Sequence, residues 1–409
     1  MKTVGIIAEY NPFHNGHRLQ IQEIGRRFPD SGIVVAMSGS FTQRGTVTIL
    51  DKWQRAEAAV RNGASLVLEL PTVFSTRSAQ YFAEGGVRLL DRLGIVDALA
   101  FGSECTDLET LTCLASEIDT TQKSPALKRG LRNGISYAAA ITESASPNTE
   151  IRQPNVILAV EYLRAIHRFH AKFLPLPLPR FYAKHHDLEI PSKEKFPVAS
   201  ASAIRAAFAN GNGCNALHTI PDDVGSMLSN AHAHGYADMN HLFRPLLAKV
   251  LTRTSEDIRS ILGVNEGIEH RIRRAASSAH TYEDTIEAVR SKRYPRAHVQ
   301  RLLLHILLSL QKESASKFDK AGPLYARVLA FNNRGRKILR AVRDQAKIPI
   351  VTKLSKFLPA RALDTAHLSL EQKMLSFDLH ATALASLTSN PVGHPPANAD
   401  FLRSPLYLH

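Results

Sequence analysis

Short apolar runs alternate with stretches of helical spacing over the first half of the chain. The runs have the length of buried strands, and turn-forming residues such as Gly, Pro, Asn or Ser follow most of them. We expect strands at 4–8, 32–36, 66–71 and 96–104. We expect helices at 16–28, 51–62, 78–93 and 154–170. This alternation predicts βαβ units on a parallel sheet, which is an α/β fold. A fifth run, 172–178, carries Pro175 and Pro177, so it is expected to be irregular or at an edge.

Beyond Gly213 the helical spacing continues almost without a break. The predicted helices span 242–253, 255–262, 266–279, 281–291, 295–312 and 334–346. The stretch 390–400 is rich in Pro, Asn and Ala, which predicts a loose C-terminal segment. We therefore predict two domains, an α/β domain over 1–213 and a mainly α-helical domain over 214–409.

The composition is that of a globular protein rather than a membrane-spanning or disulfide-rich one. The 409 residues are 44% hydrophobic and 22% charged, as in globular proteins with a sizeable core. No apolar run approaches the ~20 residues of a membrane-spanning helix, and no signal peptide precedes the first strand, so we expect a cytoplasmic protein without membrane contact. Three cysteines without a C-x-x-C pair argue against a disulfide framework or a cysteine-based zinc site.

The net charge of +14 is concentrated in one part of the chain. Lys and Arg number 24 against 23 Asp and Glu in 1–243, 24 against 10 in 244–360, and 3 against 4 in 361–409. Such asymmetry favours a polyanionic partner for the basic part, because each cation that meets a phosphate releases a counterion. The alternative is a solvated basic helical surface.

Candidate chemistry begins where the first strand meets the first helix. His14 and His17, in the pattern H-x-G-H, lie at this junction, where free backbone N–H groups and the helix dipole attract anions. The alternative is that they are surface or capping residues. A later helix opens with Ser200 and Ser202, and Arg205 follows one turn on. Capping explains one serine, whereas the arginine suits a leaving pyrophosphate.

The motifs of this chain resemble, in order, those of the bacterial tRNA(Met) cytidine acetate ligase family, within the nucleotidyltransferase superfamily that carries an H-x-G-H turn. After that turn, the resemblance is carried by MSGSFTQRG at 37–45, DKWQRAE at 51–57, LVLELP at 66–71, SAQYFAEGGVRLL at 78–90, FGSE at 101–104, QPNVILAVEYLRA at 153–165, SASAIR at 200–205, KRYPRAHVQRLLLHILL at 292–308 and RVLAFNNRG at 327–335.

The resemblance implies a Rossmann-like nucleotidyltransferase domain followed by a basic helical domain that handles tRNA. It implies an ATP-dependent ligase that activates acetate as acetyl-adenylate. The acetyl group would then pass to the wobble cytidine of elongator tRNA(Met), giving N(4)-acetylcytidine, AMP and pyrophosphate. Mg²⁺ is expected to accompany the triphosphate rather than to occupy a protein cage. The sequence does not decide the oligomeric state.

The expected site residues fall into three groups. The chemistry of adenylate formation requires positioned donors and cations, and the candidates are His14, His17, Ser202 and Arg205. The resemblance implies an ATP site at Ile7, Ala8, Glu9, Tyr10, Asn11, Pro12, Phe13, His14, Asn15, Gly16, His17, Gly102, Asn155 and Arg180. Candidate tRNA contacts are Arg271, Arg274, Lys292, Arg293, Arg296, Arg301 and Arg334.

Three further points stay open at this stage. Arg44 is a candidate partner for the acetate carboxylate or for an RNA phosphate. The adjacent His185 and His186 do not favour a metal site, because neighbouring side chains point apart. Two other functions compete with the ligase: a small-molecule adenylyl- or cytidylyl-transferase, and a non-catalytic, nucleotide-sensing RNA-binding protein.

Overall fold

A central sheet of eight strands organises the computed structural model, which describes residues 2–121, 153–180, 190–191, 197–233, 235–358, 367–389 and 396–409. The strands are β1 (Thr3–Ala8), β2 (Gly32–Ser38), β3 (Leu66–Leu70), β4 (Ala98–Ser103), β5 (Leu174–Pro179), β6 (Ala326–Asn332), β7 (Ile350–Val351) and β8 (Leu406–Leu408). Their order is β5-β4-β1-β2-β3-β6-β7, and β8 pairs with β6. The first five strands run parallel, which confirms the predicted α/β fold.

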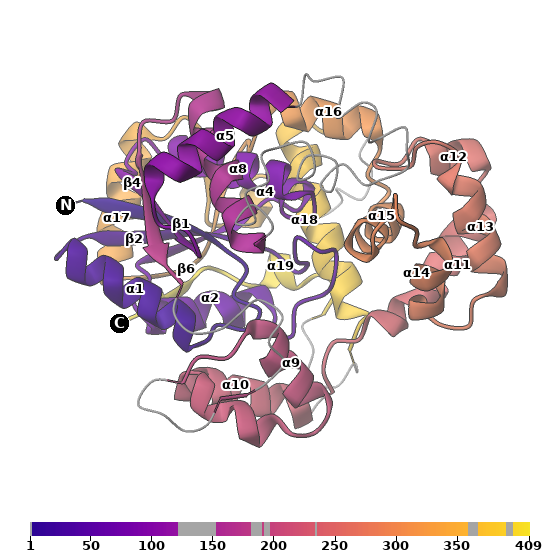
Figure 1. Ribbon diagram of the computed structural model, residues 1–409, viewed down its shortest axis with the longest axis horizontal. Coiled ribbons are helices and arrows are strands. Elements are labelled where there is room, and N and C mark those ends of the chain that lie inside the picture. The colour runs from indigo at the N-terminus through magenta and orange to yellow at the C-terminus, as the bar shows by residue number, and fades with distance from the viewer. Residues whose placement is uncertain are drawn as a thin grey trace.

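Helices cover both faces of this sheet (Figure 1). In the first half they are α1 (Asn15–Arg27), α2 (Lys52–Arg61), α3 (Thr72–Ser75), α4 (Ala79–Asp91), α5 (Leu108–Thr121), α8 (Pro154–Phe169) and α9 (Ala201–Ala209). One core joins the sheet to α4, α5 and α8, and a second joins its other face to α1, α2 and α9. Because both faces are covered, β1 to β3 are buried almost throughout, as their unbroken apolar runs require. The proline-rich strand β5, which holds Pro175, Pro177 and Pro179, lies at an edge as expected.

The basic part of the second half forms a helical bundle with its own core. The remaining helices are η2 (Gly213–Thr219), α10 (Asp222–Ala233), η3 (Met239–Leu242), α11 (Phe243–Thr252), α12 (Ser255–Arg259), α13 (Ile268–Ser278), α14 (Tyr282–Val289), α15 (Arg296–Leu308), α16 (Lys312–Ala321), α17 (Asn333–Gln345), η4 (Leu354–Lys356), α18 (Leu370–Ser386) and α19 (Ala399–Leu402). Figure 1 shows α11 to α15 gathered on the side of the molecule away from β1 and α1. Their apolar faces share a third core. None of the described helices is both long and apolar enough to cross a bilayer.

The second half is not helical without a break, and the sequence interpretation missed its three strands. The apolar run ARVLAFN at 326–332 forms β6, which pairs antiparallel with β3. Strands β7 and β8 in turn pair with β6. An apolar run of this length between two helices does fit a buried strand, but its place in the sheet depends on long-range pairing. The central sheet therefore takes strands from both sides of residue 213.

The expectation of a loose segment at 390–400 is wrong for its described part. Residues 390–395 lie outside the described residues, but 396–409 form α19 and β8. Asp400 is 1% exposed and pairs with Lys52 Nζ at 2.8 Å and Arg327 Nη2 at 2.7 Å. A buried carboxylate between two buried cations requires a fixed backbone, so this end of the chain is part of the folded core.

Candidate active site

A cavity of about 440 Å³ opens beyond the carboxyl ends of β1, β4 and β5. Ligands of open α/β sheets bind at this edge, where the ends of parallel strands and the following helix starts meet. The sequence-predicted residues that line the cavity are Ile7, Ala8, Glu9, Tyr10, Asn11, His14, Gly16, His17, Gly102, Asn155, Arg180, Ser202 and Arg205. Segments almost 200 positions apart in the sequence thus converge on one site.

Three predicted residues of the first turn do not line the cavity. Phe13 is fully buried in the core between the sheet and α1. Asn15 donates to the carbonyls of Pro197 and His218 at 3.0 and 3.1 Å, so it ties the turn to the segments around α9. Pro12 is buried in the same turn. These residues hold the turn in place rather than face a ligand.

The two histidines are held by the backbone of the first helix start. His14 is the N-cap of α1, and its Nδ1 accepts from Gly16 N at 3.1 Å. His17 Nδ1 accepts from His14 N at 3.3 Å, and the two rings stack with centroids 3.7 Å apart. Since each Nδ1 is an acceptor, each neutral ring carries its proton on Nε2. The turn thus offers two Nε2–H donors to a ligand.

Both imidazoles are neutral near pH 7. Burial lowers the pKa of His14 to about 3, and the nearby Arg180 and Arg205 guanidinium groups act in the same direction. Burial also lowers the pKa of His17 well below its usual value, with further contributions from His14 and Arg180. The positive charge of the site therefore comes from arginines, and the histidines act as neutral donors.

The start of α9 forms the facing wall and is linked to the first turn. Arg205 Nη1 donates to the Asn11 carbonyl at 2.6 Å, and its Nη2 donates to Ser202 Oγ at 3.3 Å. Ser200 Oγ accepts from Ala203 N at 3.0 Å, so capping explains this serine, as the alternative reading required. The arginine has a different function, because it places a cation between the two helix starts.

A third wall follows β4 and β5. Asn155, in the first turn of α8, donates to Glu104 Oε1 at 2.6 Å, and Arg180 lies 3.7 Å from the same oxygen. A Cβ added at Gly102 would meet Arg180 Cγ at 3.6 Å, which is ordinary contact. The unliganded protein has room for a side chain at this position. A requirement for glycine would therefore arise only if a bound ligand lies close to the backbone there.

Sequence reasoning missed the contact between Glu9 and the loop of residues 39–51. Gln43 lines the cavity, and its backbone N–H donates to Glu9 Oε1 at 2.5 Å. Gln43 Nε2 donates to the Arg77 carbonyl at 2.7 Å, which anchors the loop from its other side. Arg44 lines the cavity beside it. The only sequence signal on the loop side was that Gln43 and Arg44 fall in the motif at 37–45.

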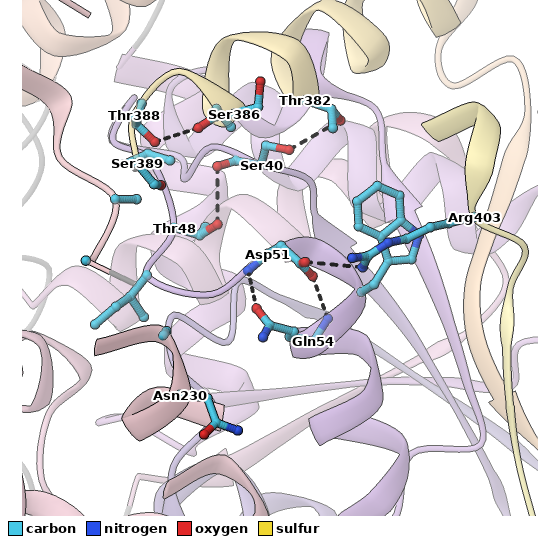
Figure 2. A pocket seen from close by; sticks show the side chains of 17 residues that line it. Ser40, Thr48, Asp51, Gln54, Asn230, Thr382, Ser386, Thr388, Ser389 and Arg403 are labelled. Carbon is cyan, nitrogen blue, oxygen red and sulfur yellow. Dashed lines mark hydrogen bonds and ion pairs between the residues drawn. The ribbon is translucent and has the colours of Figure 1, made fainter. Parts of the chain in front are cut away.

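A second cavity, of about 270 Å³, lies between residues 40–54, α10 and the end of α18 (Figure 2). Hydroxyl groups line much of it, and its two charged side chains, Asp51 and Arg403, pair with each other at 3.2 Å. Asp51 also caps α2 by accepting from Gln54 N at 2.8 Å. Because none of the predicted ATP-site residues lines this cavity and its charges are balanced, the larger cavity is the better site for a triphosphate.

Several of the predicted tRNA-contact residues have partners within the protein. Arg296 pairs with Glu283 and Glu287, and Arg293 pairs with Glu266. Three others donate to backbone carbonyls, namely Arg271 to Ala288 and Arg290, Arg334 to Ser31, and Arg301 to Gln43. Arg274 and Lys292 are exposed and form no ion pair with a described carboxylate.

No group of three or more His, Cys, Asp or Glu that could hold a metal ion occurs within the described ranges. His185 and His186 lie outside the described residues.

The fold and the site define the class of the protein. A parallel sheet whose first β–α turn carries H-x-G-H, faced by a second helix start with Ser and Arg, is the arrangement of an H-x-G-H nucleotidyltransferase fold. The family model described as HIGH Nucleotidyl Transferase matches residues 1–398.

Comparison with known proteins narrows this class to one family. The tRNA(Met) cytidine acetate ligase of Alkaliphilus metalliredigens is 34% identical over 100% of this chain and 99% of its own length. That of Caldanaerobacter subterraneus subsp. tengcongensis is 35% identical over 87% of this chain and 90% of its own length. The chain belongs to the tRNA(Met) cytidine acetate ligase family and is a ligase.

Solved structures agree with this assignment. The crystal structure of Thermotoga maritima TmcAL in its apo form I covers 100% of both chains with a TM-score of 0.90 and 30% identity. The same protein bound with alpha-thio ATP has a TM-score of 0.87, again over 100% of both chains.

Proposed function

We propose that this ligase uses ATP to activate acetate as acetyl-adenylate and transfers the acetyl group to the wobble cytidine of elongator tRNA(Met). The products are N(4)-acetylcytidine, AMP and pyrophosphate. Relatives with the name tRNA(Met) cytidine acetate ligase match the chain over nearly its whole length, and the Thermotoga maritima relative was crystallised with alpha-thio ATP. The alternatives, a small-molecule nucleotidyltransferase and a non-catalytic RNA-binding protein, are distinguished below by experiment.

The observation that carries the proposal is the convergence of His14, His17, Arg180 and Arg205 on one cavity. The two imidazoles supply neutral Nε2–H donors and the two guanidinium groups supply fixed positive charge. The starts of α1 and α9 add backbone N–H groups and the positive ends of two helix dipoles. This combination suits a triphosphate better than a neutral ligand.

The first step needs electrostatic stabilisation more than a protein nucleophile. An acetate oxygen attacks the α-phosphate in line, and the bond to pyrophosphate breaks. The imidazole donors of His14 and His17 stabilise charge on the α-phosphate. Arg205, with Ser202 beside it, stabilises the leaving pyrophosphate. In the second step the cytidine amine displaces AMP from the acetyl-adenylate.

Mg²⁺ is proposed to enter with the triphosphate, where it neutralises phosphate charge. Mg²⁺ usually takes one or two carboxylates and otherwise phosphate oxygens and water. Of the lining residues that the structure describes, Glu9 alone is acidic, which fits an ion carried mainly by ATP.

The helical part beyond residue 213 is proposed to hold the tRNA. Its segment 244–360 carries the excess of Lys and Arg, and Arg274 and Lys292 are exposed there. Arg301 brings this part to the cavity, since its Nη1 lies 3.5 Å from the carbonyl of Gln43. An RNA bound to the helices could therefore reach the loop that borders the ATP site. Arg44 is the proposed contact for acetate or for an RNA phosphate.

The test is to incubate the purified protein with ATP, acetate and unmodified elongator tRNA(Met), and to measure acetylcytidine by mass spectrometry of digested RNA and AMP by chromatography. We expect both products in equal amounts, and neither when acetate or ATP is omitted. Pyrophosphate release that requires neither acetate nor RNA would favour the small-molecule transferase. RNA binding without any product in a folded preparation would favour the non-catalytic binder.

A further inference from the structure

Glu9 is the one carboxylate among the described residues that line the ATP cavity, and its position is unexpected for a site that binds two anions. It follows β1 directly and precedes the turn that carries His14. A negative charge here repels both the triphosphate and acetate, so it weakens the binding of both substrates of the first step. A role in the second step would explain why the chain carries an acid at this place.

The contacts of Glu9 with the described residues engage only one of its two oxygens. Oε1 accepts from Gln43 N, whereas no described residue donates to Oε2. The side chain is only partly covered by protein atoms, because it faces the cavity. Its own carbonyl accepts from Arg55 Nη1 at 2.6 Å, which fixes the backbone behind it. The carboxylate is therefore held through Oε1 beside the cavity, and Oε2 has no donor among the described residues.

Four charged or titratable groups face this carboxylate. They are Arg205 on α9, Arg55 on α2, Arg44 in the 39–51 loop and Tyr162 on α8. Burial raises the pKa of Glu9, while the Gln43 N–H and then the three arginines oppose the rise. A carboxyl group whose pKa is moved from its ordinary value toward neutrality accepts a proton more readily than a surface glutamate does.

The second step requires such a proton acceptor. The exocyclic amine of cytidine is conjugated with its ring and is a weak nucleophile, and it carries a proton that must leave as the new bond forms. None of the other groups placed at the site is suited to take it, because the arginines are protonated and each imidazole already presents its N–H toward the ligand.

We propose that Glu9 is the general base of the acetyl-transfer step and the group that recognises the amine of the target cytidine. This inference rests on the proposed function. The N4 lone pair attacks the acetyl carbonyl carbon, and the C–N bond forms. The C–O bond to the adenylate then breaks, and AMP leaves with the bonding electron pair. The N4 proton passes to Glu9 Oε2 and from there to solvent.

The same contact selects cytidine over uridine. A carboxylate accepts a hydrogen bond from the N4 amino group of cytidine, whereas uridine presents an O4 acceptor at the same position. Two acceptors facing each other at short distance repel. Glu9 therefore excludes the base that cannot be acetylated.

The test uses Glu9→Gln, which keeps an oxygen to accept from Gln43 N but removes the base. Acetate-dependent exchange of labelled pyrophosphate into ATP reports the first step, and single-turnover transfer to tRNA reports the second. We expect the variant to lose transfer by about 10²- to 10⁴-fold, and this loss to exceed any change in the exchange rate by at least about tenfold. Glu9→Asp, which keeps a carboxylate on a shorter side chain, should recover part of the transfer rate.

The pH profile separates a base from a structural residue. Transfer by the unaltered enzyme should fall as the pH drops through the pKa of Glu9, because the protonated acid cannot accept the N4 proton. Transfer by Glu9→Gln should lack this limb. The inference is overturned if exchange falls as much as transfer, which indicates that Glu9 positions the loop or holds Mg²⁺, or if the low-pH limb persists in the variant. If the unaltered enzyme shows neither exchange nor transfer, the proposed function itself fails.

Discussion

Replacing Asp400 by asparagine should destabilise the whole protein, although this residue lies only nine positions before the last one. Asp400 Oδ1 contacts both Lys52 and Arg327, and Glu69 completes the cluster by pairing with the same two cations at 2.8 and 3.0 Å. All four side chains are at most 6% exposed. Although burial alone raises the pKa of Asp400, Arg327 and Lys52 bring it to about 2, so Asp400 is a carboxylate at pH 7. The cluster pairs two acidic side chains with two basic ones.

The substitution removes charge without removing volume. Asparagine keeps an oxygen at the Oδ1 position, and its amide nitrogen takes the position of Oδ2, which has no hydrogen-bond partner among the described atoms. Removing one partner of a buried ion pair costs about 3–5 kcal/mol. Because Glu69 still contacts both cations, we expect the low end, about 3 kcal/mol, which is a large share of the ~5–15 kcal/mol typical of a folded domain.

The assay is urea unfolding followed by the fluorescence of Trp53 and by circular dichroism. Trp53 is the only tryptophan, is 2% exposed and lies next to Lys52, so it reports on the cluster directly. The control is Asp344→Asn, which breaks an exposed pair with Arg343 and should change stability by less than about 0.5 kcal/mol.

A double substitution tests whether the charge balance is the cause. Lys52→Met together with Asp400→Asn returns the cluster to zero net charge, so the pair should be less destabilising than the sum of the single changes by about 1 kcal/mol or more. The reasoning is refuted if Asp400→Asn unfolds within about 0.5 kcal/mol of the unaltered protein, or if the two changes are additive.

Three further predictions concern the site, acid stability and RNA binding. His14→Ala removes an Nε2–H donor and a helix cap, so acetate-dependent pyrophosphate exchange should fall by about 10²-fold or more, while the exposed His270→Ala should not alter it. Burial lowers the pKa of His305 to about 3, so the unfolded chain binds a proton that the folded chain rejects. His305 should therefore contribute about 1 kcal/mol to the loss of stability from pH 7 to 5.5, beside the contributions of His14 and His17, and His305→Gln should reduce the loss by that amount in urea titrations at both pH values. Arg274→Glu should weaken tRNA binding and reduce the number of counterions released on binding by about one, measured by filter binding over a salt series. Arg296→Gln should have less effect, because Arg296 already pairs with Glu283 and Glu287. Equal effects of the two substitutions would contradict the distinction between exposed and paired cations.

Local patterns in the sequence were sufficient for the parallel sheet and for the two helix starts of the site. Apolar runs of strand length alternate with helical spacing. The chain can bury the strands and the apolar faces of the helices together only by packing the helices on a sheet. The pattern H-x-G-H at 14–17 and the Ser and Arg of 200–205 lie at helix starts, and parallel strands bring such starts to one edge. The cavity therefore follows from the order of elements along the chain, and the structure places both motifs on it.

The remaining features depend on contacts between distant residues, which no local pattern encodes. The pairing of β6 with β3 joins segments more than 250 positions apart. The burial of Asp400 between Lys52 and Arg327 joins residues that are 70 positions or more apart. The low pKa of His14 arises because the fold removes water from the ring and places two arginines nearby. Glu9 is held beside the cavity by the backbone N–H of Gln43, which belongs to a loop from another β–α connection. Burial and long-range electrostatics are properties of the assembled core, so they exist only once tertiary structure has formed.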